Sequence, residues 1–445
     1  MDMTKGTILP QIVSFAFPLF LGNIFQQLYN TTDCFIVGRF LGRDALAAVG
    51  STSHLVFIAI GFFNGLSIGA EVVISQAFGA KDIKALKAAI HTALLFSIII
   101  GLVLSFAGIL ASPLILKLIS VPDSVFSLAS VYLKIYFSGL LFLILYNMAS
   151  GILRALGDSK RPLYFLIFSS LINIFLDLFF VVILHKGIEG VALATVLAQM
   201  ISIIPVLFVI CLSKNEVFKV NLKELKISFP VLIKIIKIGL PGAISSSITS
   251  FSNTFMQKYV NAFGEACIAG WSVFARFDNF IIMPMQSIAF SVTTFVSQNY
   301  GAKKPQRIKK GVRLSFLMNI SLITFLALLL FISAPFLSSI FTNDKASIHY
   351  ASLFIRYTAP FYILCTTTMF FSHALRGFGI SLIPTFITFS CFVALRQIFL
   401  FVMTQIFPGD RVFGFVAFTY PLAWCVSSII MILYYKKKTE FFFKS

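Results

Sequence analysis

The chain has 445 residues, of which 58% are hydrophobic and only 11% are charged. A soluble domain carries about 25% charged residues, so this composition excludes a water-soluble fold and predicts a protein surrounded by lipid. The formal net charge of +19 does not indicate a nucleic-acid partner, because most Lys and Arg residues fall between apolar stretches on one predicted side of the membrane.

Twelve apolar stretches follow one another along the chain, and each can cross ~30 Å of hydrocarbon as a helix. The short alternating segments of a membrane β-barrel are not seen in the sequence. We therefore predict an all-α polytopic membrane protein with twelve transmembrane helices and both termini in the cytoplasm. The expected spans are 12–37, 47–77, 88–112, 126–153, 162–184, 188–212, 231–261, 267–299, 312–333, 348–375, 382–406 and 413–435.

The second half of the sequence repeats the first at a constant spacing. Residues 75–81 read SQAFGAK and residues 297–303 read SQNYGAK. Six spans in each half is an even number, so both halves enter the membrane in the same orientation, as parallel repeats do. We predict an N-terminal six-helix lobe at 1–213, a cytoplasmic linker at 214–230 and a C-terminal six-helix lobe at 231–445. Further pairs at the same spacing are Gly42 and Gly264, Arg154 and Arg376, and Gly157 and Gly379.

Several polar residues lie inside the apolar spans of the first half. A charge in the bilayer costs at least ~2.5 kcal/mol and usually serves a function. Asp33, Asp177 and Thr195 fall ~9–11 Å below the outer ends of their spans, and Tyr29 and Asn173 precede the two aspartates by four residues, on the same helix faces. The spacing predicts one polar pocket; the alternative is unrelated polar residues that face different neighbours.

Two carboxylates close together in a low-dielectric site cannot both be ionised cheaply. Asp33 and Asp177 are therefore predicted to couple transport to a proton or, through the same oxygens, to a sodium ion. Glu71, near a span end, is expected either to form an ion pair or to snorkel toward the membrane surface, and a functional charge is the alternative. The second half does not copy the two aspartates, since Met256 and Phe399 occupy the corresponding positions.

The second half offers different charged residues. Asp278 is expected either to bind a cationic substrate or to pair with an arginine, and Arg276, Arg356 and Arg396 are further candidates for substrate binding. The sequence holds no HExxH, GxSxG or GxxxxGK[ST] motif, so we expect no enzyme, no ATP-driven pump and no cofactor or resident metal.

Four stretches resemble the multidrug and toxic compound extrusion (MATE) family: FPLFLGNIFQQLYNTTDCFIVGRF, SQAFGAK, SQNYGAKKPQRIKKG and RALGDSKRP. The resemblance covers nearly the whole chain. It implies a twelve-helix antiporter whose two six-helix lobes export organic cations in exchange for protons or sodium ions.

The same resemblance implies roles for individual residues. Asp33, Asn173, Asp177, Tyr29 and Thr195 match a polar site in the N-terminal lobe of family members. A proline at which the first helix is thought to bend matches Pro18, and an acidic residue on helix 8 matches Asp278. Thr249 stands where some sodium-coupled members carry a glutamate, which weakens a sodium site in the second lobe.

We therefore expect a multidrug efflux antiporter of the bacterial cytoplasmic (inner) membrane. It would act as a monomer surrounded by lipid, with small-molecule cations as substrates. The alternative is a flippase for lipid-linked precursors or polysaccharide of the same superfamily, in which the arginines of the second half would matter most. A membrane-embedded enzyme or a channel is disfavoured, because catalytic motifs and a polar pore-lining repeat are missing from the sequence.

Overall fold

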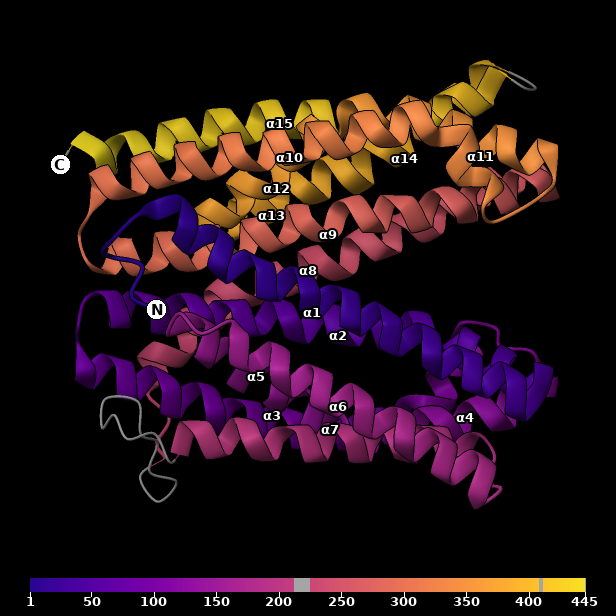
Figure 1. Cartoon of the computed structure of the whole chain (residues 1–445), viewed down its shortest axis with the longest axis horizontal. Helices are drawn as coiled ribbons and strands as arrows, with labels where there is room; N and C mark the ends of the chain where they lie inside the picture. The colour runs from indigo at the N-terminus through magenta and orange to yellow at the C-terminus, as the bar shows by residue number, and fades with distance from the viewer. Residues whose placement is uncertain (212–224, 408–410, 445) are drawn as a thin grey trace. The chain divides into compact units, whose positions relative to one another are not determined.

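The computed structural model describes residues 1–211, 225–407 and 411–444 (Figure 1). Within these ranges the regular structure is entirely helical, which confirms the predicted all-α polytopic fold. The elements are α1 (Ile8–Ile36), η1 (Val37–Leu41), α2 (Gly42–Gly79), α3 (Ile83–Leu118), α4 (Asp123–Ser138), α5 (Leu140–Ala155), α6 (Lys160–Leu178), η2 (Phe179–Ile183), α7 (Ile188–Cys211), α8 (Phe229–Asn261), α9 (Glu265–Gly301), α10 (Pro305–Ser339), α11 (Lys345–Thr358), η4 (Ala359–Phe361), α12 (Tyr362–Gly377), α13 (Leu382–Phe389), η5 (Ser390–Leu395), α14 (Arg396–Ile406) and α15 (Arg411–Lys444).

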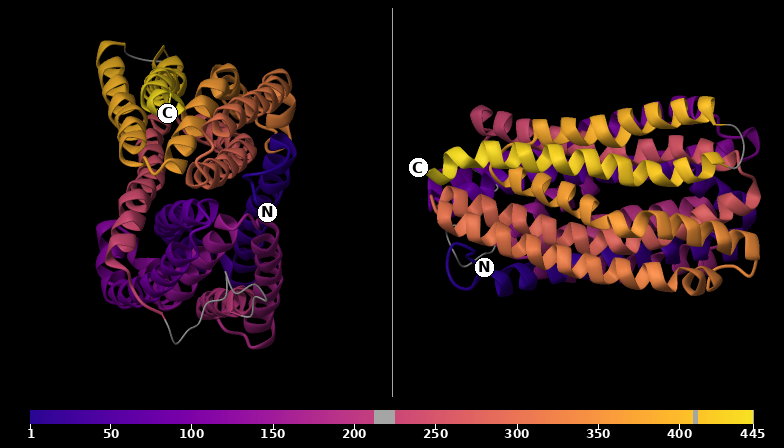
Figure 2. Two further views of the ribbon diagram at one scale, coloured as in Figure 1. Left: turned by 90° about the vertical axis from the view of Figure 1, so that its left-hand side faces the viewer. Right: turned by 90° about the horizontal axis from the view of Figure 1, so that it is seen from above.

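The described helices group into the twelve predicted spans. In the part of the chain that the structure describes, nine helical runs are long and apolar enough to cross a membrane, and one of them, Ile8–Gly79, contains both α1 and α2. The pair α4 and α5 passes the same test as one bent span, and α11 with α12 takes the corresponding place in the second half. The axes of the helices within each half are nearly aligned (Figure 2).

Two of the predicted spans are broken where unbroken helices were expected. The stretch 126–153 contains the end of α4 and the start of α5, which meet at Gly139 with a bend of 45°. A Cβ on Gly139 would lie 2.5 Å from Cγ2 of Val196, so the close approach of α7 requires a glycine there. In the second half the 3-10 turn η4, which contains Pro360, makes the matching break.

The backbone reproduces the sequence repeat. Three left-handed residues of the first half have counterparts at the repeat spacing with nearly the same φ angles. In the two SQxxGAK motifs the left-handed residue is the lysine, although the helix itself ends at the glycine two positions earlier. The pairs are Gly42 (φ 83) and Gly264 (φ 84), Lys81 (φ 56) and Lys303 (φ 53), and Gly157 (φ 83) and Gly379 (φ 85).

The chain divides into two compact units whose boundaries differ from the predicted lobes. It changes unit inside α1, next to Pro18, and again inside α8, next to Pro241. Most of the predicted linker 214–230 lies outside the described residues. Unit 1 is Met1–Asp2 with Phe17–Ala243, and unit 2 is Met3–Ala16 with Ile244–Ser445.

In unit 1 the first part of α8 packs backbone against backbone on α2. A Cβ on Gly65 would collide with the Cα of Ala243, and one on Gly69 would collide with the carbonyl oxygen of Ile235. Small residues four positions apart allow two helices in lipid to approach this closely. Gly65 and Gly69 therefore hold α2 and α8 together without side chains between them.

Unit 2 contains the repeat-related contact between α9 and the first part of α1. Ser291 corresponds to Gly69, and its hydroxyl donates to the carbonyl oxygen of Ile12 at 3.1 Å. Farther toward the start of the chain, the guanidinium of Arg307 donates to backbone carbonyl oxygens at 2.8–3.0 Å. These bonds tie the N-terminal segment to the first turn of α10. The accepting residues are Met3, Lys5 and Gly6.

Candidate functional site

Unit 1 contains a cavity of about 280 Å³ with walls from α1, α2, α4, α5, α6 and α7. Tyr29, Asp33 and Thr195 line it. Asn173 and Asp177 do not; they lie behind the wall, with 1% and 0% of their surfaces exposed. The predicted pocket of five polar groups is therefore three groups on the cavity surface and two buried groups behind them.

Asp33 and Asp177 are neighbours. The side chain of Asp33 is 9% exposed, and each of the two carboxyl groups lies within interacting distance of the other. Among the described residues, no N–H or O–H group donates to Oδ1 of Asp33 or to either oxygen of Asp177. Two carboxylates cannot bond to each other without a proton, so this pair needs a shared proton or a bound cation.

Asn173 lies one helical turn before Asp177 and is also unsatisfied. Neither Oδ1 nor Nδ2 of its amide has a hydrogen-bond partner in the described part of the chain. A buried amide without a partner is costly, and water or an ion commonly satisfies such groups. The Asn173 amide oxygen and the carboxylates of Asp33 and Asp177 are the ligand types that sodium or calcium would take.

Tyr29 and Thr195 are coupled across the cavity wall. The Tyr29 hydroxyl lies within hydrogen-bonding reach of the Thr195 side chain, whose own hydroxyl donates to the carbonyl oxygen of Val191 at 3.1 Å. Thr195 thus satisfies its donor inside α7 and leaves its lone pairs for the phenol. This arrangement fixes the phenol ring of Tyr29 one turn from Asp33.

Short π-helical segments accompany the candidate acids. The segment η1 begins four residues after Asp33, and η2 begins two residues after Asp177. In the second half, η5 ends directly before Arg396. A π-helical turn inserts a residue into an α-helix, changes the direction of the following side chains, and is frequent at functional sites.

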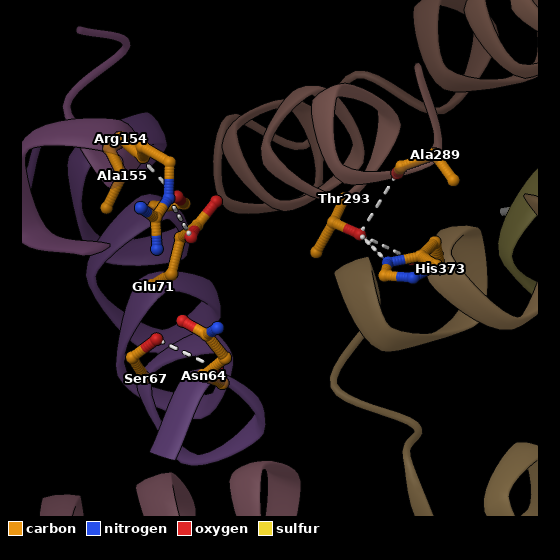
Figure 3. A network of polar contacts seen from close by, with 9 residues as sticks. Asn64, Ser67, Glu71, Arg154, Ala155, Ala289, Thr293 and His373 are labelled. Atoms are coloured by element: carbon orange, nitrogen blue, oxygen red, sulfur yellow. Dashed lines mark hydrogen bonds and ion pairs between the residues drawn. The ribbon is translucent and has the colours of Figure 1, made fainter. Parts of the chain in front are cut away.

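Glu71 forms the predicted ion pair. Its Oε2 lies 3.0 Å from Nε of Arg154, which joins α2 to α5 (Figure 3). The side chain of Glu71 is 2% exposed, whereas that of Arg154 is 18% exposed and lines the cavity. Arg154 is therefore part of the cavity wall, whereas Glu71 is buried and does not line the cavity.

The corresponding positions in unit 2 hold a different contact. Thr293 is the repeat counterpart of Glu71, and its hydroxyl lies 3.1 Å from Nδ1 of His373 (Figure 3). Arg376, the counterpart of Arg154, is 6% exposed, and its Nε has no partner among the described residues. His373 was not among the residues singled out from the sequence. The sequence does signal that the second half lacks this ion pair, because the repeat position that corresponds to Glu71 holds a threonine.

Of the four charged candidates of the second half, Asp278 and Arg396 lie close enough to interact electrostatically. Asp278 accepts a hydrogen bond of 2.6 Å from the Tyr362 hydroxyl, and in the described part of the chain it forms no ion pair with an arginine. Arg396 is 3% exposed and lies over the ring of Tyr420, 4.1 Å from its centroid. The other two candidates are exposed, unlike the buried Arg396 and the partly buried Asp278. They are Arg276 and Arg356.

Both halves of the chain match one family model. This model, described as MatE, matches residues 18–179 and matches again over residues 241–402. The chain belongs to the MatE family. The two matched ranges cover the two sequence repeats, so each half of this MatE protein is one copy of the family's unit.

Known relatives of this MatE protein span almost its full length. The probable multidrug resistance protein YoeA of Bacillus subtilis (strain 168) is 29% identical over 441 residues, covering 97% of this chain and 94% of the relative. Two crystal structures, of MATE in the straight conformation and of MATE in the bent conformation, superpose with a TM-score of 0.91 each. The straight form is 21% identical, and the match covers 100% of this chain and 99% of that structure. The bent form is 22% identical, and the match covers 99% of this chain and 98% of that structure.

Proposed function

We propose that this MatE protein is a secondary active multidrug exporter that exchanges organic cations for protons or sodium ions. Its relative in Bacillus subtilis is named a probable multidrug resistance protein, which supports export of several compounds. The most specific support comes from the carboxyl pair, because Asp33 faces the cavity while Asp177 lies unsatisfied behind it. A cationic substrate in the cavity and a proton or sodium ion at the pair then compete for the same negative charge.

The exchange follows from this competition. Entry of a proton or sodium ion from outside removes one negative charge from the Asp33–Asp177 pair and weakens its attraction for a bound cation. Each monovalent ion that enters releases ~2.3 kcal/mol per 100 mV of membrane potential. Export is thus driven by the ion that occupies the carboxyl pair, and the amide oxygen of Asn173 is a further ligand for that ion. The contact between Tyr29 and Thr195 fixes the phenol ring near Asp33.

A change in α1 is the proposed mechanical step. Pro18 lies inside α1 and lines the cavity, and it cannot donate the backbone hydrogen bond of an ordinary helical residue. The chain changes unit between Ala16 and Phe17, immediately before this proline. Ion binding at Asp33 would favour a form of α1 bent at Pro18 that narrows the cavity and expels the substrate.

The protein is proposed to act as a monomer in the bacterial cytoplasmic membrane with both termini inside, because the basic segments between spans favour that orientation. For the flippase alternative the arginines of the second half would have to line a basic cavity. Arg276 and Arg356 are exposed instead, and the lining of the unit 1 cavity contains neither them nor Arg396. The position of the Asp33–Asp177 carboxyl pair at the unit 1 cavity favours a cation exporter over a flippase.

The test is transport of ethidium by purified protein in liposomes under an imposed proton gradient or an imposed sodium gradient. We expect one gradient to drive transport and Asp33→Asn to abolish it. The matched control is Asp44→Asn, the same change at an exposed residue at the start of α2, which should transport as the wild type does. Equal transport by Asp33→Asn and wild type would refute coupling at this site.

A further inference from the structure

Unit 2 buries an arginine that lacks the negative partner of its repeat counterpart. In unit 1 the guanidinium of Arg154 pairs with Glu71 at 3.0 Å (Figure 3). In unit 2 the corresponding arginine is Arg376, and Thr293 stands where the glutamate would be. Arg376 is 6% exposed, and among the described residues it forms no ion pair and its Nε has no hydrogen-bond partner. The described part of unit 2 therefore does not neutralise this buried charge.

A second repeat position also differs beside this arginine. A Cβ on Gly151 would lie 3.5 Å from Nη2 of Arg154, so the guanidinium of unit 1 passes next to a glycine. The residue of unit 2 at that position is His373. Its Nδ1 lies 3.1 Å from the Thr293 hydroxyl, and its ring lies within electrostatic range of Arg376. A hydroxyl and an imidazole form hydrogen bonds but carry no negative charge, so they cannot replace the missing carboxylate.

The turn that follows Arg376 holds another unsatisfied donor. Gly379, with a φ of 85°, donates its N–H to the carbonyl oxygen of Arg376 at 2.8 Å, and Ser381 follows two residues later. The Ser381 side chain is buried at the start of α13, makes no cap hydrogen bond, and its Oγ has no partner in the described part of the chain. This turn thus buries a guanidinium N–H and a hydroxyl without an acceptor. An anion is the ligand that accepts from both groups.

We propose that unit 2 binds a small inorganic anion such as chloride at Arg376, in the role that Glu71 has in unit 1. The Nε–H of Arg376 donates to the anion, and the hydroxyl of Ser381 is a second donor. A buried ion without a partner is strongly destabilising, so an anion that binds only the folded protein stabilises unit 2. The burial of Arg376 favours a free anion over the larger phosphate group of a lipid. The site belongs to unit 2 and does not depend on the proposed transport function.

Thermal unfolding of the purified protein in detergent tests this assignment, in potassium chloride and in potassium gluconate of equal ionic strength. Both tryptophans of the chain, Trp271 and Trp424, belong to unit 2, so tryptophan fluorescence follows the unfolding of this unit. We expect the Tm of the wild type to be roughly 2–4 °C higher in chloride and the gain to saturate as chloride is titrated. Arg376→Gln should abolish the difference, whereas the matched control Arg356→Gln, at an exposed arginine of α11, should retain it.

A second variant tests the site even where Arg376→Gln does not fold. Thr293→Glu combined with His373→Gly gives unit 2 the residues that unit 1 has at Glu71 and Gly151, and its internal carboxylate should remove the dependence on chloride. Three results would each overturn the assignment. The first is an equal Tm of the wild type in the two salts. The others are a chloride effect of wild-type size in Arg376→Gln or in the double variant.

Discussion

The ion pair between Glu71 and Arg154 offers a quantitative test of how unit 1 is held together. Substituting Glu71 by Ala leaves the guanidinium of Arg154 without its carboxylate, 3.0 Å away in the native protein. Breaking a buried pair by removing one partner costs about 3–5 kcal/mol. Since the Arg154 side chain is 18% exposed to the cavity, water can reach it, and we expect the lower end, about 3 kcal/mol.

The assay is a double-mutant cycle on Glu71→Ala and Arg154→Ala. The free energy of unfolding is measured by denaturant titration in mixed micelles, and the cycle isolates the pairwise coupling. The exposed pair of Arg161 and Asp158 is the matched control, with side chains 56% and 26% exposed; Arg161→Ala should cost at most about 1 kcal/mol. A coupling energy below about 0.5 kcal/mol between Glu71 and Arg154 would show that this ion pair does not stabilise unit 1.

Three further predictions concern other parts of the fold. Gly69→Leu should lower the free energy of unfolding of unit 1 by about 1–3 kcal/mol, because the leucine side chain would collide with the carbonyl oxygen of Ile235. Denaturant titration measures this loss. Hydrogen bonds from the hydroxyl and the backbone N–H of Ser347 hold the pKa of Asp344 below its usual value. The ionised carboxylate therefore stabilises α11 at pH values above the usual pKa, and this stabilisation is lost as the pH falls through the lowered pKa. The loss of stability in acid should be smaller in Asp344→Ala than in the wild type. Pro18→Ala should slow ethidium transport while leaving ethidium affinity within about threefold, and transport at the wild-type rate would show that no bend at Pro18 is required.

The repeat and the order of the spans could be predicted from sequence because they depend on hydrophobic runs and on spacing. The repeat appears in the backbone as matched φ angles at Gly42 and Gly264. The break at Gly139 could not be predicted, because a glycine is tolerated in an apolar helix and only the approach of Val196 makes it necessary. The left-handed conformation of Lys81 could not be predicted either, because lysine rarely adopts a positive φ angle.

The residues of the candidate site were named from the sequence, but the sequence did not show which of them face the cavity and which are buried behind its wall. Depth and four-residue spacing place Asp33 and Asp177 at one level, and the structure makes them neighbours. Spacing along one helix says nothing of how that helix is rotated against its neighbours, so the burial of Asp177 behind the cavity wall was not foreseen. The amides Gln26 and Asn30 were overlooked, although they share the helical spacing of Asp33 along α1.

An organic cation and the coupling ion are proposed to exclude each other at Asp33. The release of protons or sodium ions when ethidium binds to the purified protein measures this exclusion directly, with a pH indicator and a sodium-selective electrode as detectors. We expect binding to release one of these ions from the wild type and none from Asp33→Asn. Ethidium binding that releases neither ion from the wild type, or equal release from Asp33→Asn, would contradict competition at this carboxylate.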